Sequence, residues 1–284
     1  MSAAIDREPL DAWIGKTERL RDQVTAGPIA SLAATLDRHP PPPRDGDPLP
    51  YLWHWLYFLP CHNASELGGD GHAKLGRFLP PVPLPRRMWA GSRFEFGPPL
   101  QMGETIERVS TIKRIDIKQG RSGVLGFVTV EHAVVGDRGG GLLEEHDIVY
   151  RERSKPGAAP RDPLPAPDNA QWTVTIHPDP VLLFRYSAVT FNGHRIHYDR
   201  DYCREVEGYD GLVVHGPLIA TLLLEPAARQ TLGLRLRRFS FRAVSPILDT
   251  QDFHVSGNRE GGALSLWASR MDGALAMQAE ADVE

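Results

Sequence analysis

The chain has 284 residues and a formal net charge of −4, with 41% hydrophobic and 24% charged residues. This composition is typical of a soluble globular protein that buries a core without disulfides or metals. It lacks the strong basic charge that marks nucleic-acid-binding proteins, and no run of 18 apolar residues predicts a membrane span. The two cysteines, Cys61 and Cys203, lie far apart and indicate a reducing, cytoplasmic setting. The polar, acid-containing N-terminus lacks the apolar segment of a secretory signal.

The first half of the chain predicts a helical stretch followed by four strands. Residues 10–37 are predicted as helix, broken at the Gly27-Pro28 pair, and from Ile29 onward apolar residues follow the i, i+3, i+4, i+7 spacing of one helical face. Glycine-rich turns separate the segments that follow. The predicted strands are residues 89–96, 105–119, 124–135 and 142–150.

A proline-rich segment, residues 155–168, predicts a linker between two units. Its prolines suit neither a helix interior nor a sheet ladder, so it should form a stiff, extended spacer. The predicted units are residues 1–154 and residues 169–284, which are of roughly similar size.

The second half has the same coarse order as the first. A short strand at 172–176 precedes a helix at 178–188, and a longer helix at 216–231 has a wide apolar face and a proline at Pro226. The remaining predicted strands are residues 234–243, 252–257, 263–271 and 276–283. These patterns predict an α+β fold in which antiparallel sheets each wrap around a central helix, and the sheets of two duplicated units pair side by side.

The segment from Phe191 to Asp199 has the sequence Phe-Asn-Gly-His-Arg-Ile-His-Tyr-Asp and contains most of the candidate catalytic and substrate-binding residues. His197 titrates close to working pH and suits acid/base catalysis. Gly216 precedes a proline at an expected helix start, where its free N–H can bind a developing oxyanion. Each of these residues alone is more typical of a turn or a buried contact, and only their joint order favours a site.

This order resembles the MaoC-like hydratase/dehydratase family, which has the hotdog fold. The family motif is Ser-Gly-Asp-x-Asn-Pro-x-His, with a His-Gly pair about twenty residues later, here His215-Gly216. The sequence is most similar to one branch of this family, the mesaconyl-C4-CoA (itaconyl-CoA) hydratases and the mitochondrial-type 3-hydroxyacyl-thioester dehydratases. The segments that carry this similarity are residues 190–199, 208–218, 239–246 and 89–96. The resemblance implies a double hotdog with one active site in the C-terminal unit.

The resemblance also implies site residues, with one departure from the family pattern. Asn192 stands where the family has its catalytic Asp, and an amide cannot act as a general base. His197 would then activate water, Asn192 would position it, and the N–H of Gly216 would polarise the thioester. Arg195 could bind a substrate carboxylate or pair with a neighbouring aspartate, two alternatives that the sequence leaves open, and His194 and His215 are further candidates for contacting the substrate.

The acyl-CoA substrate implied by the family carries the only cofactor group expected, and no metal site is predicted. Arg235 and Arg237 share one face of an expected strand and could meet the adenosine phosphates, whereas Arg238 would face the other way. The glycine-rich residues 68–72 lack the ending of a phosphate-binding loop and are interpreted as a flexible loop or part of a lid.

The function expected from this resemblance is a lyase that adds water reversibly to mesaconyl-C4-CoA or itaconyl-CoA, giving citramalyl-CoA. One alternative is a 3-hydroxyacyl-thioester dehydratase of fatty acyl chains. An alternative of another class is a non-catalytic hotdog that binds acyl-CoA. No nucleic-acid or membrane partner is expected, and a duplicated hotdog allows a homodimer without requiring one.

Overall fold

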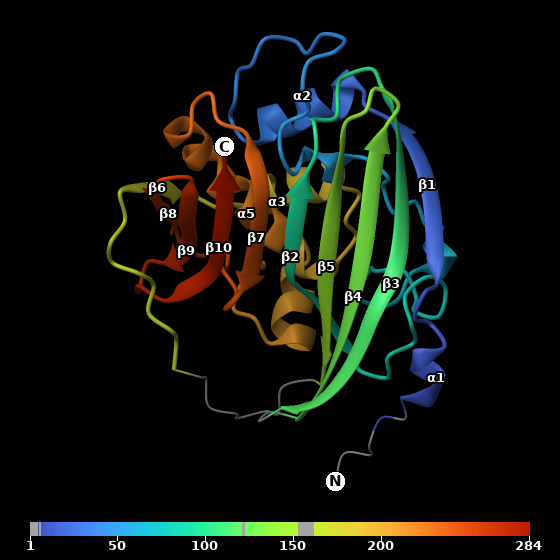
Figure 1. Cartoon of the computed structure of the whole chain (residues 1–284). Coiled ribbons are helices and arrows are strands. Elements are labelled where there is room, and N and C mark those ends of the chain that lie inside the picture. Colours follow the sequence, from blue (N-terminus) through green and yellow to red (C-terminus); the bar gives the residue numbers. More distant parts are fainter. Residues whose placement is uncertain (1–4, 6, 121–122, 153–161) are drawn as a thin grey trace.

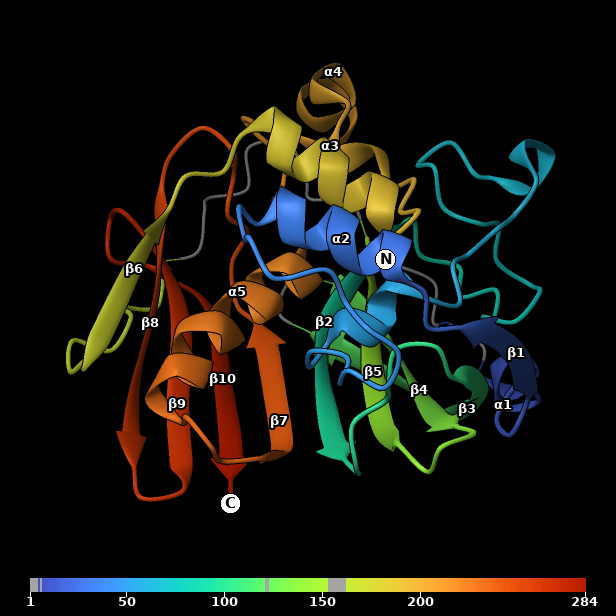
Figure 2. The ribbon, with the colours of Figure 1, turned by 90° about the horizontal axis from the view of Figure 1, so that it is seen from above.

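The computed structural model describes residues 5, 7–120, 123–152 and 162–284. One antiparallel sheet of ten strands runs through the whole molecule, in the order β1-β3-β4-β5-β2-β7-β10-β9-β8-β6 (Figure 1). Helices α2, α3 and α5 lie together over one face of this sheet (Figure 2). Within the described ranges, no helix is long and apolar enough to cross a bilayer.

The N-terminal half supplies five strands and several short helices. The strands are β1 (Thr17–Gln23), β2 (Arg86–Phe96), β3 (Thr105–Gly120), β4 (Gly123–Gly136) and β5 (Gly141–Arg151). The helical segments are α1 (Glu8–Asp11), α2 (Ala26–Thr35), η1 (Trp53–Leu56) and η2 (Ala64–Glu66). The four strands predicted here are confirmed, each extended by one to three residues at one or both ends.

The helix predicted over residues 10–37 is wrong in its first part. Thr17–Gln23 forms β1, an edge strand that pairs with β3 and alternates between exposed and half-buried residues. Its sequence, Thr-Glu-Arg-Leu-Arg-Asp-Gln, carries charges on the solvent side, so it lacks the β-branched signal of an inner strand. The later part is helical as expected, and Ile29, Leu32 and Ala33 of α2 are buried.

The C-terminal half wraps four strands around one long helix, with a fifth strand at the outer edge. The strands are β6 (Trp172–Ile176), β7 (Leu236–Ala243), β8 (Phe253–Glu260), β9 (Ala263–Arg270) and β10 (Leu275–Val283). The helices are α3 (Pro180–Val189) and α5 (Gly216–Gln230), with short helical turns at η3 (Arg195–His197), α4 (Arg200–Tyr202) and η4 (Cys203–Glu207) between them. The predicted apolar face of α5 is buried, and the helix continues through Pro226.

The two half-sheets join through β2 and β7, which pair from Gly91↔Arg242 to Glu95↔Arg238. Aromatic side chains from both strands, among them Phe94, Phe239 and Phe241, stack across this junction within one continuous core. Two hotdog units therefore lie side by side, as the sequence predicted. The sheet edge that single hotdogs would leave open here is closed inside the chain.

Half of the predicted linker lies outside the described residues. Residues 155–161 belong to that part, while residues 162–168 run along the C-terminal unit. There Pro165 forms an isolated bridge with Ala274, and Leu275 donates a backbone hydrogen bond to Leu164. The boundaries expected at 154 and 169 remain a prediction.

Candidate active site

His197 lies at the end of η3 with its ring buried and held in one tautomer. Its Nδ1 lies 2.7 Å from the carbonyl oxygen of Val213. Because a carbonyl can only accept, Nδ1 carries the proton and Nε2 keeps a free lone pair. Burial lowers the pKa of His197 to about 4, although the bond to Val213 opposes this shift. The side chain is thus a neutral base at neutral pH.

His215 is fully buried behind His197 and fixes its plane. The two rings stack with centroids 3.6 Å apart and planes 18° from parallel. Nε2 of His215 is 2.8 Å from the hydroxyl of Ser187 on α3. Burial, followed by the proximity of His197 and His194, lowers the pKa of His215 well below its usual value. His215 therefore supports His197 as a neutral stacking partner.

Asn192 shapes the backbone of the segment that carries these histidines. Its Oδ1 accepts a hydrogen bond of 3.0 Å from the backbone N–H of His194, an Asx-type turn. Phe191 just before it has φ of 50°, in the left-handed region that non-glycine residues seldom adopt. The amide that replaces the family's aspartate thus uses its oxygen to hold the turn.

Arg195 forms the ion pair that was one of its two alternatives. Its guanidinium donates to Asp199 at 2.7 and 2.9 Å and to the carbonyl of Gly69 at 3.0 Å. It also lies over the ring of Tyr202, 4.2 Å from the ring centroid. These contacts occupy the arginine and bind the site segment to a loop of the N-terminal unit.

That loop, residues 68–72, packs directly onto the site segment. The backbone N–H of Arg195 donates to the carbonyl of Asp70 at 2.9 Å. A Cβ built on Gly71, whose φ is +88°, would lie 1.9 Å from the carbonyl oxygen of Gly193, and one on Gly193 would lie 2.8 Å from that of Gly71. The loop interpreted from sequence as flexible or lid-like is therefore docked, and two glycines permit the approach.

Replacing Gly71 with alanine is expected to separate the loop from the site segment. The new methyl group would collide with backbone, which cannot move aside as a side chain can, so we expect a lower melting temperature and at least a ten-fold loss of kcat/KM, about the cost of a misplaced catalytic group. Gly76→Ala is the matched control, because Gly76 has φ of +90° but no atom within 4 Å of the added Cβ. Equal losses in both variants would contradict the packing argument.

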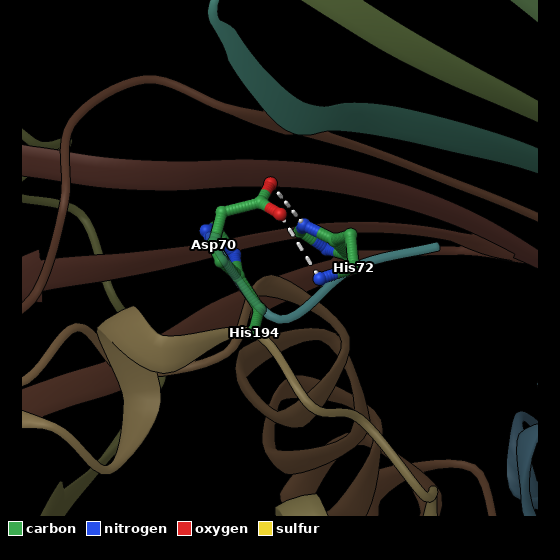
Figure 3. A group of neighbouring side chains, drawn as sticks. All are labelled: Asp70, His72 and His194. Atoms are coloured by element: carbon green, nitrogen blue, oxygen red, sulfur yellow. Dashed lines mark hydrogen bonds and ion pairs between the residues drawn. The ribbon is translucent and has the colours of Figure 1, made fainter. Parts of the chain in front are cut away.

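The docked loop brings two further ionisable residues to the site. Asp70 points toward His72, and His194 lies beside them (Figure 3). Oδ2 of Asp70 is 2.9 Å from Nδ1 of His72, and the rings of His72 and His194 are 4.0 Å apart. His194 in turn meets His197 edge to face, with centroids 5.5 Å apart. An aspartate–histidine pair from the N-terminal unit thus faces the histidines of the C-terminal unit.

The charges in this group are set by burial and by each other. Burial lowers the pKa of His72, and it lowers that of His194 to about 2 with the help of the neighbouring His72. Burial alone would raise the pKa of Asp70, but its hydrogen bond with His72 and the charge of Arg87 hold that pKa well below its usual range. At neutral pH the group holds one carboxylate beside neutral imidazoles.

Asp70, His72 and His194 are also spaced as metal ligands can be, with donor atoms within 4.8 Å of one another. Two features disfavour a cation here. Nδ1 of His72 is already engaged by the carboxylate, and Arg87 lies close enough to lower the pKa of all three residues. A fixed positive charge of this kind repels a metal ion and attracts an anion.

Gly216 begins α5 immediately after His215, and Pro217 occupies the first turn. The first N–H groups of a helix have no intrahelical partner and carry the positive end of the helix dipole. This is the position expected from the sequence for a thioester oxyanion. The structure thus gathers Asn192, His194, His197, His215 and Gly216 at one end of α5.

The predicted CoA-binding arginines lie elsewhere. Arg237 is at the start of β7, where it pairs with Glu284, and the Arg235 backbone pairs with the same residue. The site end of β7 is Ala243, about 20 Å away at strand geometry. The structure does not bring Arg235 and Arg237 to the histidine cluster, and their contact with CoA remains a prediction.

Residues 52–249, about two thirds of the chain, match the model of the hydroxyacyl-thioester dehydratase type 2 family. The chain belongs to this family. It is 45% identical over 272 residues to a mesaconyl-C(4)-CoA hydratase of Chloroflexus aurantiacus, covering 96% of this chain and 97% of that protein. It is 28% identical to the mitochondrial hydroxyacyl-thioester dehydratase type 2 of Schizosaccharomyces pombe, covering 88% and 92% of the two chains. As a member of a dehydratase family, the protein is a hydro-lyase, as the sequence predicted.

The fold is shared with solved MaoC-like dehydratases. A MaoC-like dehydratase of Phytophthora capsici superposes with a TM-score of 0.65 and covers 99% of both chains, at 14% identity. At this identity the likeness concerns the fold alone.

Sequence reasoning missed Asp70 and His72. The signal available was an Asp-Gly-His triplet inside a glycine-rich stretch, Gly-Gly-Asp-Gly-His at residues 68–72. Glycines that permit close backbone approach could have suggested docking, but the partner segment is about 120 residues away in the chain. Only the fold brings the two together.

Proposed function

We propose that the protein hydrates mesaconyl-C4-CoA, or the isomeric itaconyl-CoA, to citramalyl-CoA in a reversible reaction. The observation that carries this proposal is the meeting of neutral histidines from both units at the N-terminus of α5. The near full-length similarity to a mesaconyl-C(4)-CoA hydratase supports the choice of substrate. Hydration of mesaconyl-C4-CoA adds the water oxygen to the β-carbon and a proton to the α-carbon, so no electron acceptor is consumed. In itaconyl-CoA the double bond joins the β-carbon to a methylene group, and the proton adds to that methylene carbon instead.

His197 is proposed to take the proton from water through its free Nε2, because Nδ1 is committed to Val213. The proton that His197 takes from water is proposed to pass to the α-carbon, directly or by way of His194 and the free Nε2 of His72, whose Nδ1–H is held by Asp70. The N–H of Gly216 stabilises the enolate oxygen that develops on the thioester. Asn192 and His215 hold this arrangement through the turn and the stacked ring.

We further propose that the reaction needs no cofactor besides the CoA of its substrate. The chemistry is proton transfer alone, and the buried imidazoles can supply it. Cys61 and Cys203 are both free thiols, which supports the cytoplasmic location expected from the sequence. A homodimer remains a prediction, since β2 and β7 already join the two sheets within one chain.

The test follows the absorbance of the enoyl-thioester band with two substrates, mesaconyl-C4-CoA and crotonyl-CoA. We expect the wild-type protein to prefer mesaconyl-C4-CoA by about ten-fold or more in kcat/KM, the lower end of the discrimination that a single pocket contact provides. Equal or faster turnover of crotonyl-CoA would favour the alternative, a 3-hydroxyacyl-thioester dehydratase of fatty acyl chains. No turnover of either substrate would favour a non-catalytic acyl-CoA-binding protein.

A further inference from the structure

We propose that Arg87 and the hydroxyl of Tyr150 bind the free carboxylate of the substrate and thereby set the enzyme's specificity. This inference rests on the proposed function, because only a carboxylated enoyl-CoA presents such a group. It places the anion site in the N-terminal unit, across the cluster from His197.

The two residues lie side by side on the face of the sheet that carries the core. Arg87 on β2 is directly opposite Tyr150 on β5 in the register of these antiparallel strands. Directly opposite residues have Cβ atoms about 5 Å apart and point to the same side. Next along β2 on this face is Trp89, whose ring lies 3.9 Å from that of His146 on β5. Arginine, phenol and imidazole therefore face the interior together.

Tyr150 is fully buried, and its hydroxyl makes no hydrogen bond with any described residue. Arg87 is the polar neighbour of this hydroxyl: its charge and its side-chain contact with the phenol both oppose the rise in the pKa of Tyr150 that burial causes, but the contact falls short of a full hydrogen bond. A buried hydroxyl that lacks a well-formed hydrogen bond is destabilising. A carboxylate between the two side chains would accept from both and satisfy the phenol.

Arg87 has no carboxylate within ion-pair distance among the residues that the structure describes. Its neighbours show the contrast: Arg86 pairs with Glu207 at 3.0 Å, and Arg93 pairs with Asp147 at 2.6 Å. Arg87 is half-buried, so water screens its charge only in part. A bound anion would form an ion pair with Arg87, as Glu207 does with Arg86 and Asp147 does with Arg93.

The charge of Arg87 acts on the ionisable side chains of the candidate site. It is one of the causes that lower the pKa values of Asp70, His72 and His194. In mesaconyl-C4-CoA the free carboxylate is attached to the β-carbon, the atom that receives the water oxygen. A carboxylate held by Arg87 would therefore place that carbon beside the histidine cluster.

The same contact would assist the chemistry. A carboxylate on the β-carbon repels an approaching hydroxide-like nucleophile, and a guanidinium on the far side of that carboxylate offsets the repulsion. Burying the carboxylate without a cation would carry a large desolvation cost. Arg87 should thus raise both the affinity and the turnover of the carboxylated substrate, whereas for crotonyl-CoA it acts only through the pKa values of the neighbouring cluster.

The experiment compares Arg87→Met, Tyr150→Phe and the control Arg93→Met on both substrates. Arg93 is on the same strand but faces solvent, where it pairs with Glu145 and Asp147. For Arg87→Met we expect kcat/KM for mesaconyl-C4-CoA to fall by about 100-fold or more, the effect of removing one partner of a buried charge pair. The value for crotonyl-CoA, which loses only the effect of Arg87 on the pKa values of the cluster, should fall by less than about ten-fold, so the ratio of the two substrates still falls. Tyr150→Phe should lose about ten-fold, as for a hydrogen bond to a charged group, and Arg93→Met should match the wild type.

Inhibition by two saturated analogues separates this inference from the proposed function. Succinyl-CoA ends in a carboxylate and butyryl-CoA in a methyl group, and we expect the ratio of their inhibition constants to favour succinyl-CoA only while Arg87 is present. An unchanged ratio in Arg87→Met, or equal losses on both substrates, would overturn the inference even with an active wild-type enzyme. A wild-type enzyme that prefers crotonyl-CoA would overturn the proposed function, whatever the ratio. If Arg87→Met fails to fold, Tyr150→Phe and Arg87→Lys carry the same comparison.

Discussion

Replacing His197 with glutamine is expected to lower kcat by about a thousand-fold, within the range that a positioned acid or base contributes. Glutamine fills much of the same space and can still donate to Val213, but it has no basic nitrogen to take a proton from water. KM should change far less, because the His197 ring is proposed to act on the attacking water and not to bind the thioester. Stopped-flow or steady-state absorbance of the enoyl-thioester band gives both constants.

His177→Gln is the matched control for this variant, since that histidine lies on the surface and pairs with Asp252. It should keep wild-type kinetics. A His197→Gln enzyme with wild-type kcat and an unchanged melting temperature would remove His197 from the chemistry. Circular dichroism and the binding of butyryl-CoA distinguish a loss of chemistry from a loss of folding. A folded variant that still binds butyryl-CoA has lost only the chemical step.

Changing Asp70 to asparagine is expected to lower kcat by about 100-fold or more, because the aspartate selects the tautomer of His72. The carboxylate accepts the proton on Nδ1 and leaves Nε2 basic. An asparagine can donate to Nδ1 instead, which would stabilise the opposite tautomer and block Nε2 with a proton. The measurement is kcat for mesaconyl-C4-CoA in Asp70→Asn, His72→Gln and the double variant.

The double variant tests whether the two residues act as one unit. If they do, its loss should equal that of His72→Gln alone and fall short of the product of the single losses. Asp179→Asn is the control, because this residue caps α3 through its side chain and asparagine caps a helix equally well. Losses that multiply would mean that Asp70 and His72 serve separate purposes.

Most of the fold could be predicted from the sequence, because local pattern decided it. Alternation and turn residues located β2 to β5 and β7 to β10, and the apolar stripe located α5. The edge strand β1 escaped because its charged residues face solvent, so only its pairing with β3 makes it a strand. Propensity says little where a neighbouring strand supplies the stabilisation.

The candidate site also has a part that local sequence pattern predicts and a part that only the fold brings together. His194, His197 and Gly216 are close in sequence, so a local motif is enough to group them. Asp70 and Arg87 are contributed by the other unit, and nothing local to either residue marks its partner. The role of Arg195 also depended on geometry, because the sequence offered two partners and the fold shows Asp199.

The contact between Gly71 and Gly193 has a consequence for how such a protein can be inherited and reassembled. A duplicated unit ordinarily leaves one copy free to diverge, yet here the copy without the histidine motif contributes a carboxylate, an imidazole and a guanidinium to the group at the other. Neither half could be exchanged for its counterpart from another double hotdog without losing part of that group. The two units therefore form one functional whole: the pairing of β2 with β7 joins their sheets, and the contact of Gly71 with Gly193 joins their polar groups.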